Sequence, residues 1–125
     1  MAKYVDGFVI VAPRKKRAEY RKMATWGKKM WMKYGALDYK ECVGDDLHPK
    51  MGGMPMRAFP QLAGAKKGED VWFSFIVYRS KKHRDAVNAK VMKAMEKEME
   101  KHKDKPMPFD MKRFSYGGFK VVVDK

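Results

Sequence analysis

Cysteine is nearly absent from this sequence, since Cys42 is the only one among 125 residues. One cysteine cannot form a disulfide within the chain, which excludes the disulfide-rich secreted domains and makes a reducing cytosol the expected compartment. No apolar run approaches the roughly 20 residues needed to span a membrane, and the first residues show no signal-peptide pattern. We therefore expect a cytoplasmic protein without a membrane partner.

Acidic residues are also few, with 15 Asp and Glu against 29 Lys and Arg, and the net charge is +14. Such a charge predicts attraction to polyanions but says nothing about the fold. The lysines are spread along the whole chain, and the sequence contains no RNP-like aromatic motif, zinc finger or basic zipper. A lysine-rich solvated surface is the favoured interpretation, and nucleic-acid binding is the less favoured alternative.

The hydrophobic pattern predicts one domain, 1–125, with the element order strand, helix, strand, strand, helix, strand. Strands are indicated at 4–12, 36–46, 70–79 and about 113–123, and helices at 14–34 and about 81–103. Residues 47–69, rich in Gly, Pro and Met, are expected to be irregular. This order is that of an α+β, ferredoxin-like βαββαβ fold, in which two helices cover one face of an antiparallel sheet.

The strand at 70–79 is apolar on both faces, with Ser74 as the exception among its central residues, and the strand at 4–12 is similar. Two helices can cover only one face of the sheet, so the second face would leave a large apolar patch in water. We expect a second copy of the chain to cover it in a symmetric homodimer. The alternative is that the connection at 47–69 folds over this face.

Several blocks of the sequence resemble the YbaA-like family, a bacterial domain of unknown function in the dimeric α/β-barrel superfamily. They are YVDGFV at 4–9, ECVGDD at 41–46, FPQ at 59–61, FSFIVYRSKKHRDAVNAKVM at 73–92, MPFDMKR at 107–113 and YGGF at 116–119. The resemblance covers nearly the whole chain and implies a homodimer whose two sheets close a barrel. It brings no established activity. Other members of the superfamily are small monooxygenases, haem-degrading enzymes and isomerases, which is an analogy of fold only.

Arg84 and Asn88 fall within the apolar arc of the second predicted helix, one turn apart. Asp6 interrupts the apolar first strand in the same unexpected way. Since the first strand and the second helix of a split βαβ fold begin at the same end of the sheet, we predict that Asp6 lies near Arg84 or Asn88. The three side chains would hold a small ligand between helix and sheet. The alternative is a structural ion pair.

Glu41, Asp45 and Asp46 lie at the end of the second predicted strand, with His48 just beyond. Carboxylates beside a histidine suit a divalent metal or acid–base chemistry, but the spacing matches no metal motif. The cations of 14–17 oppose the dipole of the first helix, so either Asp45 and Asp46 offset them or an anion binds there. Surface ion pairing is the favoured interpretation.

The remaining candidates carry weaker signals. His48, Met51, Met54 and Met56 could hold Cu(I), although the 12 methionines of this chain are better explained as core filler. Cys42 is expected to be a buried, inert thiol. Tyr116, beside Gly117 and Gly118, could direct its hydroxyl into a pocket or simply pack.

Three hypotheses for the function follow from the sequence. The first is a homodimer that binds a small organic ligand through Asp6, Arg84 and Asn88, helped by Glu41, Asp45, Asp46 and Tyr116, with no cofactor or metal assigned. The second is a basic RNA-associated protein that acts through 14–17 and scattered lysines. The third is a structural dimer without a ligand.

Overall fold

The computed structural model describes residues 2–50, 52–101, 103 and 105–125. Its one antiparallel sheet consists of β1 (Tyr4–Pro13), β2 (Asp38–Val43), β3 (Glu69–Tyr78) and β4 (Ser115–Lys120), in the order β2-β3-β1-β4. The helices are α1 (Arg17–Lys33), α2 (Phe59–Ala63) and α3 (Lys81–Lys101), with short 3-10 turns η1 (Arg14–Lys16) and η2 (Met111–Arg113). The architecture is α+β, with the main elements in the predicted order.

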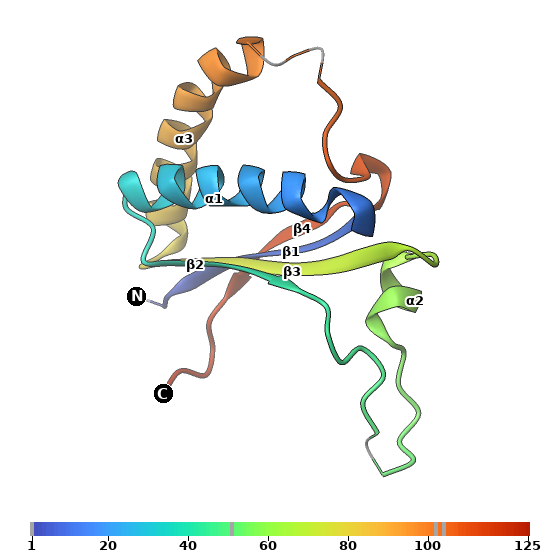
Figure 1. Ribbon diagram of the computed structural model, residues 1–125. Coiled ribbons are helices and arrows are strands. Elements are labelled where there is room, and N and C mark those ends of the chain that lie inside the picture. The colour runs from blue at the N-terminus through green and yellow to red at the C-terminus, as the bar shows by residue number, and fades with distance from the viewer. Residues whose placement is uncertain (1, 51, 102, 104) are drawn as a thin grey trace.

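The two long helices, α1 and α3, lie on one face of the sheet, and the short α2 lies on the other (Figure 1). Two residues mark the ends of the long helices. Gly35 follows α1 with a φ of +112°, a conformation that favours glycine. The Ser80 Oγ accepts a hydrogen bond of 3.1 Å from the backbone N–H of His83, which caps the start of α3.

Several predicted boundaries differ from the structure. The expected helix at 14–34 begins as the separate turn η1, and the second and fourth strands are shorter than 36–46 and 113–123. The segment at 47–69 is not wholly irregular, because it contains α2. Strand ends are weakly marked in sequence, since the residues just beyond the last hydrogen-bonded pair have the same composition as the strand.

The core lies between the sheet and the two long helices. The helix-facing residues of β1 and β3 pack against one side of α1 in one cluster and against α3 in a second. Only the first half of α3 contributes buried apolar residues to this core. Val87 and Val91 are buried, but Met92 and Met99, in the second half of the helix, are exposed. Figure 1 shows the reason, since the second half of α3 rises away from the sheet.

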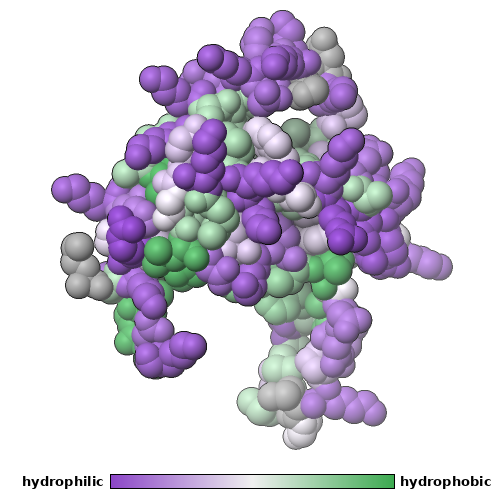
Figure 2. Space-filling model, turned by 60° about the vertical axis from the view of Figure 1, so that its left-hand side comes forward, coloured by the Kyte–Doolittle hydropathy of each residue, from purple (hydrophilic) through white to green (hydrophobic). Residues whose placement is uncertain are grey.

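The opposite face of the sheet is mostly uncovered. Val11 and Val71 are buried at the end of the face that α2 covers, whereas Phe73 and Phe119 are 46% and 62% exposed. We call the uncovered part of this surface, centred on Phe73, Phe75 and Phe119, the open sheet face. Hydrophobic side chains gather in the lower half of Figure 2, the side of the sheet away from α1 and α3. The connection at 47–69 therefore covers only part of the second face.

Within the described residues, no helix is both long and apolar enough to cross a membrane.

Candidate functional site

Glu41 lies on β2 and directs its carboxylate toward α1. Three hydroxyl groups donate hydrogen bonds to it. Tyr20 and Ser74 donate to Oε1, at 2.9 Å and 2.5 Å, and Tyr39 donates to Oε2 at 2.7 Å. The strand register explains the arrangement, because Ser74 stands directly opposite Glu41 and Tyr39 precedes it by two residues on the same face. We call these four residues the Glu41 cluster.

The hydroxyls of the Glu41 cluster are held in their neutral form. Burial raises the pKa of both Tyr20 and Tyr39 well above the usual tyrosine value, and the neighbouring Glu41 carboxylate raises it further. Ionising either tyrosine would place a phenolate beside a carboxylate, away from most of the water. The two phenols therefore stay protonated and act as hydrogen-bond donors to Glu41.

A pocket of about 390 Å³ opens beside this cluster, between α1 and the β2 side of the sheet. Its wall combines cations of α1 with polar and aromatic residues of the sheet, including Arg17, Arg21, Lys28, Tyr39, Glu41 and Trp72. The indole of Trp72 stacks on the Tyr20 ring, with centroids 4.1 Å apart. Its Nε1 is buried and has no hydrogen-bond partner among the described residues. The pocket thus brings one carboxylate and three cations together, with the Trp72 side chain in its wall.

The cations at the start of the first helix are offset by Asp70 and not by Asp45 or Asp46. Asp70 is buried at the start of β3, where Arg14 Nε donates to Oδ1 at 3.0 Å and Arg17 donates to both carboxylate oxygens, at 2.9 Å and 2.7 Å. The hydrogen bond from Arg17 lowers the pKa of Asp70 below its usual value. Asp45 and Asp46 are exposed and have no ion pair in the described part of the chain.

The predicted proximity of Asp6 to Arg84 and Asn88 is confirmed. Arg84 Nη1 donates to Asp6 Oδ1 at 2.7 Å, and Asn88 Nδ2 donates to Asp6 Oδ2 at 3.4 Å. The Asn88 Oδ1 in turn accepts from Trp31 Nε1 at 3.0 Å and from the Tyr78 hydroxyl at 3.1 Å. These polar groups satisfy one another, and neither of the two pockets along α1 includes Asp6, Arg84 or Asn88. The geometry is that of a structural network.

Tyr116 joins this network from β4. Arg84 Nη1 lies 3.1 Å from the Tyr116 hydroxyl, and the Tyr116 ring stacks on Phe8 with centroids 4.8 Å apart. Burial raises the pKa of Tyr116, and the nearby Asp6 carboxylate acts in the same direction. Tyr116 is therefore joined to Asp6 and Arg84, and the structure does not bring it to Glu41, whose contacts run to α1 and β3.

The structure also shows the surroundings of two weaker candidates, Cys42 and the methionines proposed to hold Cu(I). Cys42 is exposed, and the prediction of a buried thiol is wrong, because Cys42 pairs with Phe73 across the strands and shares the open sheet face. Met54 and Met56 are exposed, and Met51 lies outside the described residues. Among the residues described, no group of three or more His, Cys, Asp or Glu side chains is placed to hold a metal ion.

Comparison with known proteins places the chain in a family. Residues 3–111 match the family described as "Protein of unknown function (DUF1428)". The chain belongs to this family. It is 38% identical over 123 residues to the "Uncharacterized protein YbaA" of Escherichia coli strain K12, covering 98% of this chain and 99% of that protein. The protein of the same name from Shigella flexneri matches equally well. The resemblance to the YbaA-like family is confirmed.

Sequence reasoning missed most of the site in this DUF1428 protein. It identified Glu41 but not its donors Tyr20, Tyr39 and Ser74, nor the ion pairs of Asp70. A signal was present, since Ser74 and Asp70 are the polar residues in the helix-facing set of β3. If the register between β2 and β3 were known from the sequence, Ser74 would be predicted to lie directly opposite Glu41. The register depends on where the long connection at 44–68 returns the chain to the sheet, which its Gly52-Gly53 turn does not fix by itself.

Proposed function

We propose that this chain binds a small organic ligand in the pocket beside Glu41. The observation that carries the proposal is a carboxylate fixed by three hydroxyls at the wall of a 390 Å³ pocket. A volume of this size suits a metabolite, and a few fixed polar groups in a partly apolar wall are typical of ligand sites. The proposal moves the site from Asp6, Arg84 and Asn88 to Glu41, because the former three satisfy one another.

A thermal-shift screen of metabolites tests this proposal. A ligand present at 100 times its dissociation constant adds about 2.7 kcal/mol to the free energy of unfolding. We expect at least one compound to raise the melting temperature of the wild type but not that of Glu41→Gln. Asp45→Asn is the matched control, since Asp45 is exposed and lies outside the pocket. The proposal fails when no compound raises the wild-type melting temperature, or when every active compound acts equally on Glu41→Gln.

We further propose that the protein is a homodimer, formed when the open sheet faces of two ferredoxin-like domains meet as in a dimeric α/β barrel. The order β2-β3-β1-β4, with two helices on one face, supports the ferredoxin-like assignment. Charge also favours a second copy as the partner. At the β2 edge of the open face the charged residues Asp38 and Lys40 pair with each other at 3.1 Å, so this pair adds no net charge to the surface where two chains would meet.

A cytoplasmic location is part of the proposal, because Cys42 is a free, exposed thiol, which is typical of a reducing compartment.

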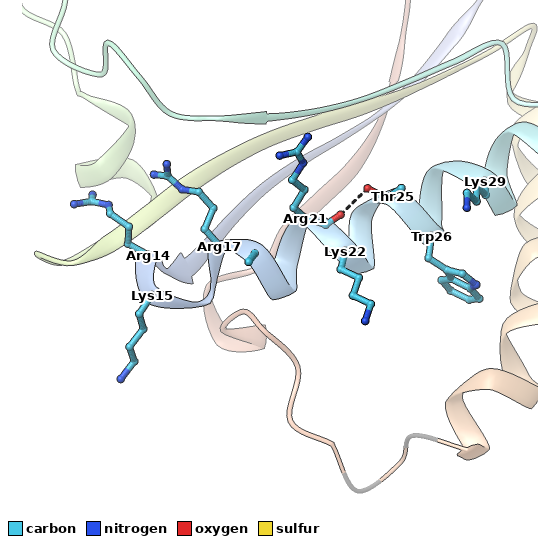
Figure 3. Close-up of a pocket in the computed structure, with 9 residues that line it drawn as sticks. Arg14, Lys15, Arg17, Arg21, Lys22, Thr25, Trp26 and Lys29 are labelled. Carbon is cyan, nitrogen blue, oxygen red and sulfur yellow. Dashed lines mark hydrogen bonds between the residues drawn. The ribbon is translucent and has the colours of Figure 1, made fainter.

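RNA binding along α1 is a second candidate function, supported by a broad pocket of about 870 Å³ on this helix. Figure 3 shows Arg14, Arg17 and Arg21 extending to one side of α1, toward the sheet, and Lys15, Lys22 and Trp26 extending to the other. Cations beside a half-buried aromatic ring such as that of Trp26 suit single-stranded nucleic acid. Under this hypothesis, affinity for RNA falls steeply with salt, with a log–log slope of several units. Weak binding at physiological salt excludes it.

A further inference from the structure

The Glu41 carboxylate has one hydrogen-bonding position left for a ligand. A carboxylate accepts about four hydrogen bonds, two at each oxygen. Tyr20 and Ser74 occupy both positions on Oε1, and Tyr39 occupies one on Oε2. The second position on Oε2 therefore suits an O–H or N–H donor from a molecule in the pocket.

Trp72 needs the opposite kind of partner, a hydrogen-bond acceptor. This residue lines the same pocket and is 5% exposed, and its Nε1–H is a buried donor without a partner in the described residues. Unpaired buried donors are rare in native proteins, because they lose their hydrogen bonds to water without replacement. Because this nitrogen has no open surface in the free protein, an acceptor on a ligand completes the donor only when the indole shifts toward the pocket. A hydroxyl group meets both requirements, since it donates and accepts, whereas an ammonium group only donates.

The charge of the pocket points to an anion. Arg17 is already paired with Asp70, but Arg21 and Lys28 have no carboxylate partner in the described part of the chain. Seven residues separate these two cations, which places them about 10 Å apart along one side of α1. Both line the pocket that contains Glu41. They outnumber the single carboxylate there, so the site favours a ligand of one or two negative charges.

Building on the proposed ligand pocket, we propose that its ligand is a small hydroxylated organic anion. The hydroxyl group donates to Glu41 Oε2 and accepts from Trp72 Nε1. A carboxylate or phosphate group of the same molecule binds Arg21 and Lys28. Both anionic groups share the chemistry that these cations recognise, and the experiment below distinguishes them.

The test is isothermal titration calorimetry of the full chain with two matched pairs of probes. Malate and succinate differ by one hydroxyl group. Glycerol 3-phosphate and 1-propyl phosphate have the same three-carbon phosphate ester, and only the former carries alcohol hydroxyls. We expect one hydroxylated probe to bind about tenfold or more tightly than its partner, because a site built to bond a hydroxyl rejects the analogue that lacks it. The pair that shows this preference identifies the anionic group as carboxylate or phosphate.

Two variants assign the binding to this pocket. Arg21→Gln is expected to weaken binding of the preferred probe about 10- to 100-fold, the effect of losing a charge-assisted hydrogen bond. Lys22→Gln removes the same charge from the adjacent residue, which extends to the other side of α1 in Figure 3, and is expected to change the affinity less than about threefold. Trp72→Phe keeps an aromatic ring without the Nε1–H and is expected to reduce the preference for the hydroxylated probe.

Each outcome bears on the inference. Equal affinity for both members of each pair overturns it, as does equal weakening by Arg21→Gln and Lys22→Gln. When none of the four probes binds, and the metabolite screen finds a neutral or cationic compound that depends on Glu41, the assignment to hydroxylated anions is wrong while the proposed pocket stands. When the screen finds no compound either, the proposed function fails as well.

Discussion

The guanidinium of Arg84 and the carboxylate of Asp6 meet at 2.7 Å, although 78 residues separate them in the chain. The Asp6 side chain is 1% exposed and that of Arg84 is 14% exposed, so both charges are largely withdrawn from water. The Arg84 guanidinium also lies 4.9 Å from the centre of the Tyr4 ring. This pair joins the start of α3 to the centre of the sheet.

Replacing Arg84 with methionine is expected to cost about 3–5 kcal/mol of unfolding free energy, because it leaves the buried Asp6 carboxylate without its cation. Urea unfolding followed by circular dichroism measures the change. Asp85→Asn is the control, since Asp85 pairs with the same guanidinium at 2.7 Å but is 60% exposed. Its loss should cost less than about 1 kcal/mol. Equal costs for the two variants would contradict a structural role for the buried pair.

The Asp6–Arg84 pair was predictable because two independent features of the sequence indicated the same location. Asp6 and Arg84 are polar exceptions in apolar patterns, and the order of the elements brings their segments to the same end of the sheet. The Glu41 cluster was not predictable in the same way. Its members Tyr20, Tyr39 and Ser74 come from α1, β2 and β3, and tyrosine and serine are not unusual enough to mark a site by themselves.

The pairing of Asp70 with Arg14 and Arg17 shows a second limit of the sequence. Charge alone indicated that the cations at 14–17 need an anion, and Asp45, Asp46 and Asp70 all lie near that end of the sheet. Only the register of β3, which directs Asp70 to the helix side, decides among them. Predictions of alternation and element order were reliable here, while partners across the fold depended on loop geometry.

Stability is expected to fall at alkaline pH because of the Glu41 cluster. The pKa of Tyr39 is raised in the folded protein. The folded protein therefore holds this proton more tightly than the unfolded chain does, whose tyrosines titrate near about 10. The stabilisation is complete below that pH and is lost as the pH rises above it, by up to about 1.4 kcal/mol per pH unit for each such tyrosine.

Urea unfolding of the wild type and of Tyr39→Phe between about pH 9 and pH 11 measures this slope. The lysines titrate in the same range but contribute similarly to both proteins, so the difference in slope isolates Tyr39. We expect a shallower decline in Tyr39→Phe. Identical slopes would show that the proton on Tyr39 is not held by the fold.

Gly118 is expected to be intolerant of a side chain, because a Cβ there would lie 2.5 Å from the Tyr4 hydroxyl oxygen and 2.6 Å from a carbon of its ring. Displacing Tyr4 also disturbs its contact with Arg84, so we expect Gly118→Ala to cost about 1–3 kcal/mol. Gly117→Ala is the neighbouring control, since its Cβ would meet Phe119 at an ordinary 3.7 Å. Thermal melts of the two variants compare them directly, and similar melting temperatures would contradict the steric argument.

The proposed homodimer predicts that a charge at the centre of the open sheet face separates the protomers. Phe73 is 46% exposed and lies 6.0 Å and 6.4 Å, centroid to centroid, from Phe75 and Phe59. Burying such a side chain contributes about 1.5–3 kcal/mol, and Phe73→Glu adds the cost of desolvating a carboxylate. We therefore expect Phe73→Glu to weaken dimerisation at least about 100-fold. Sedimentation equilibrium at micromolar concentration measures it.

Met99→Glu is the matched control for Phe73→Glu, because Met99 is 62% exposed but lies near the end of α3, away from the open sheet face. We expect the Met99→Glu variant to remain a dimer. Cys42 provides a second readout, since it pairs with Phe73 across the strands and would be covered by the partner. Its reaction with a thiol reagent should be slow in the wild type and in Met99→Glu but fast in Phe73→Glu. A wild type that sediments as a single protomer, with a freely reactive Cys42, would mean that the apolar face stays in water and that no barrel forms.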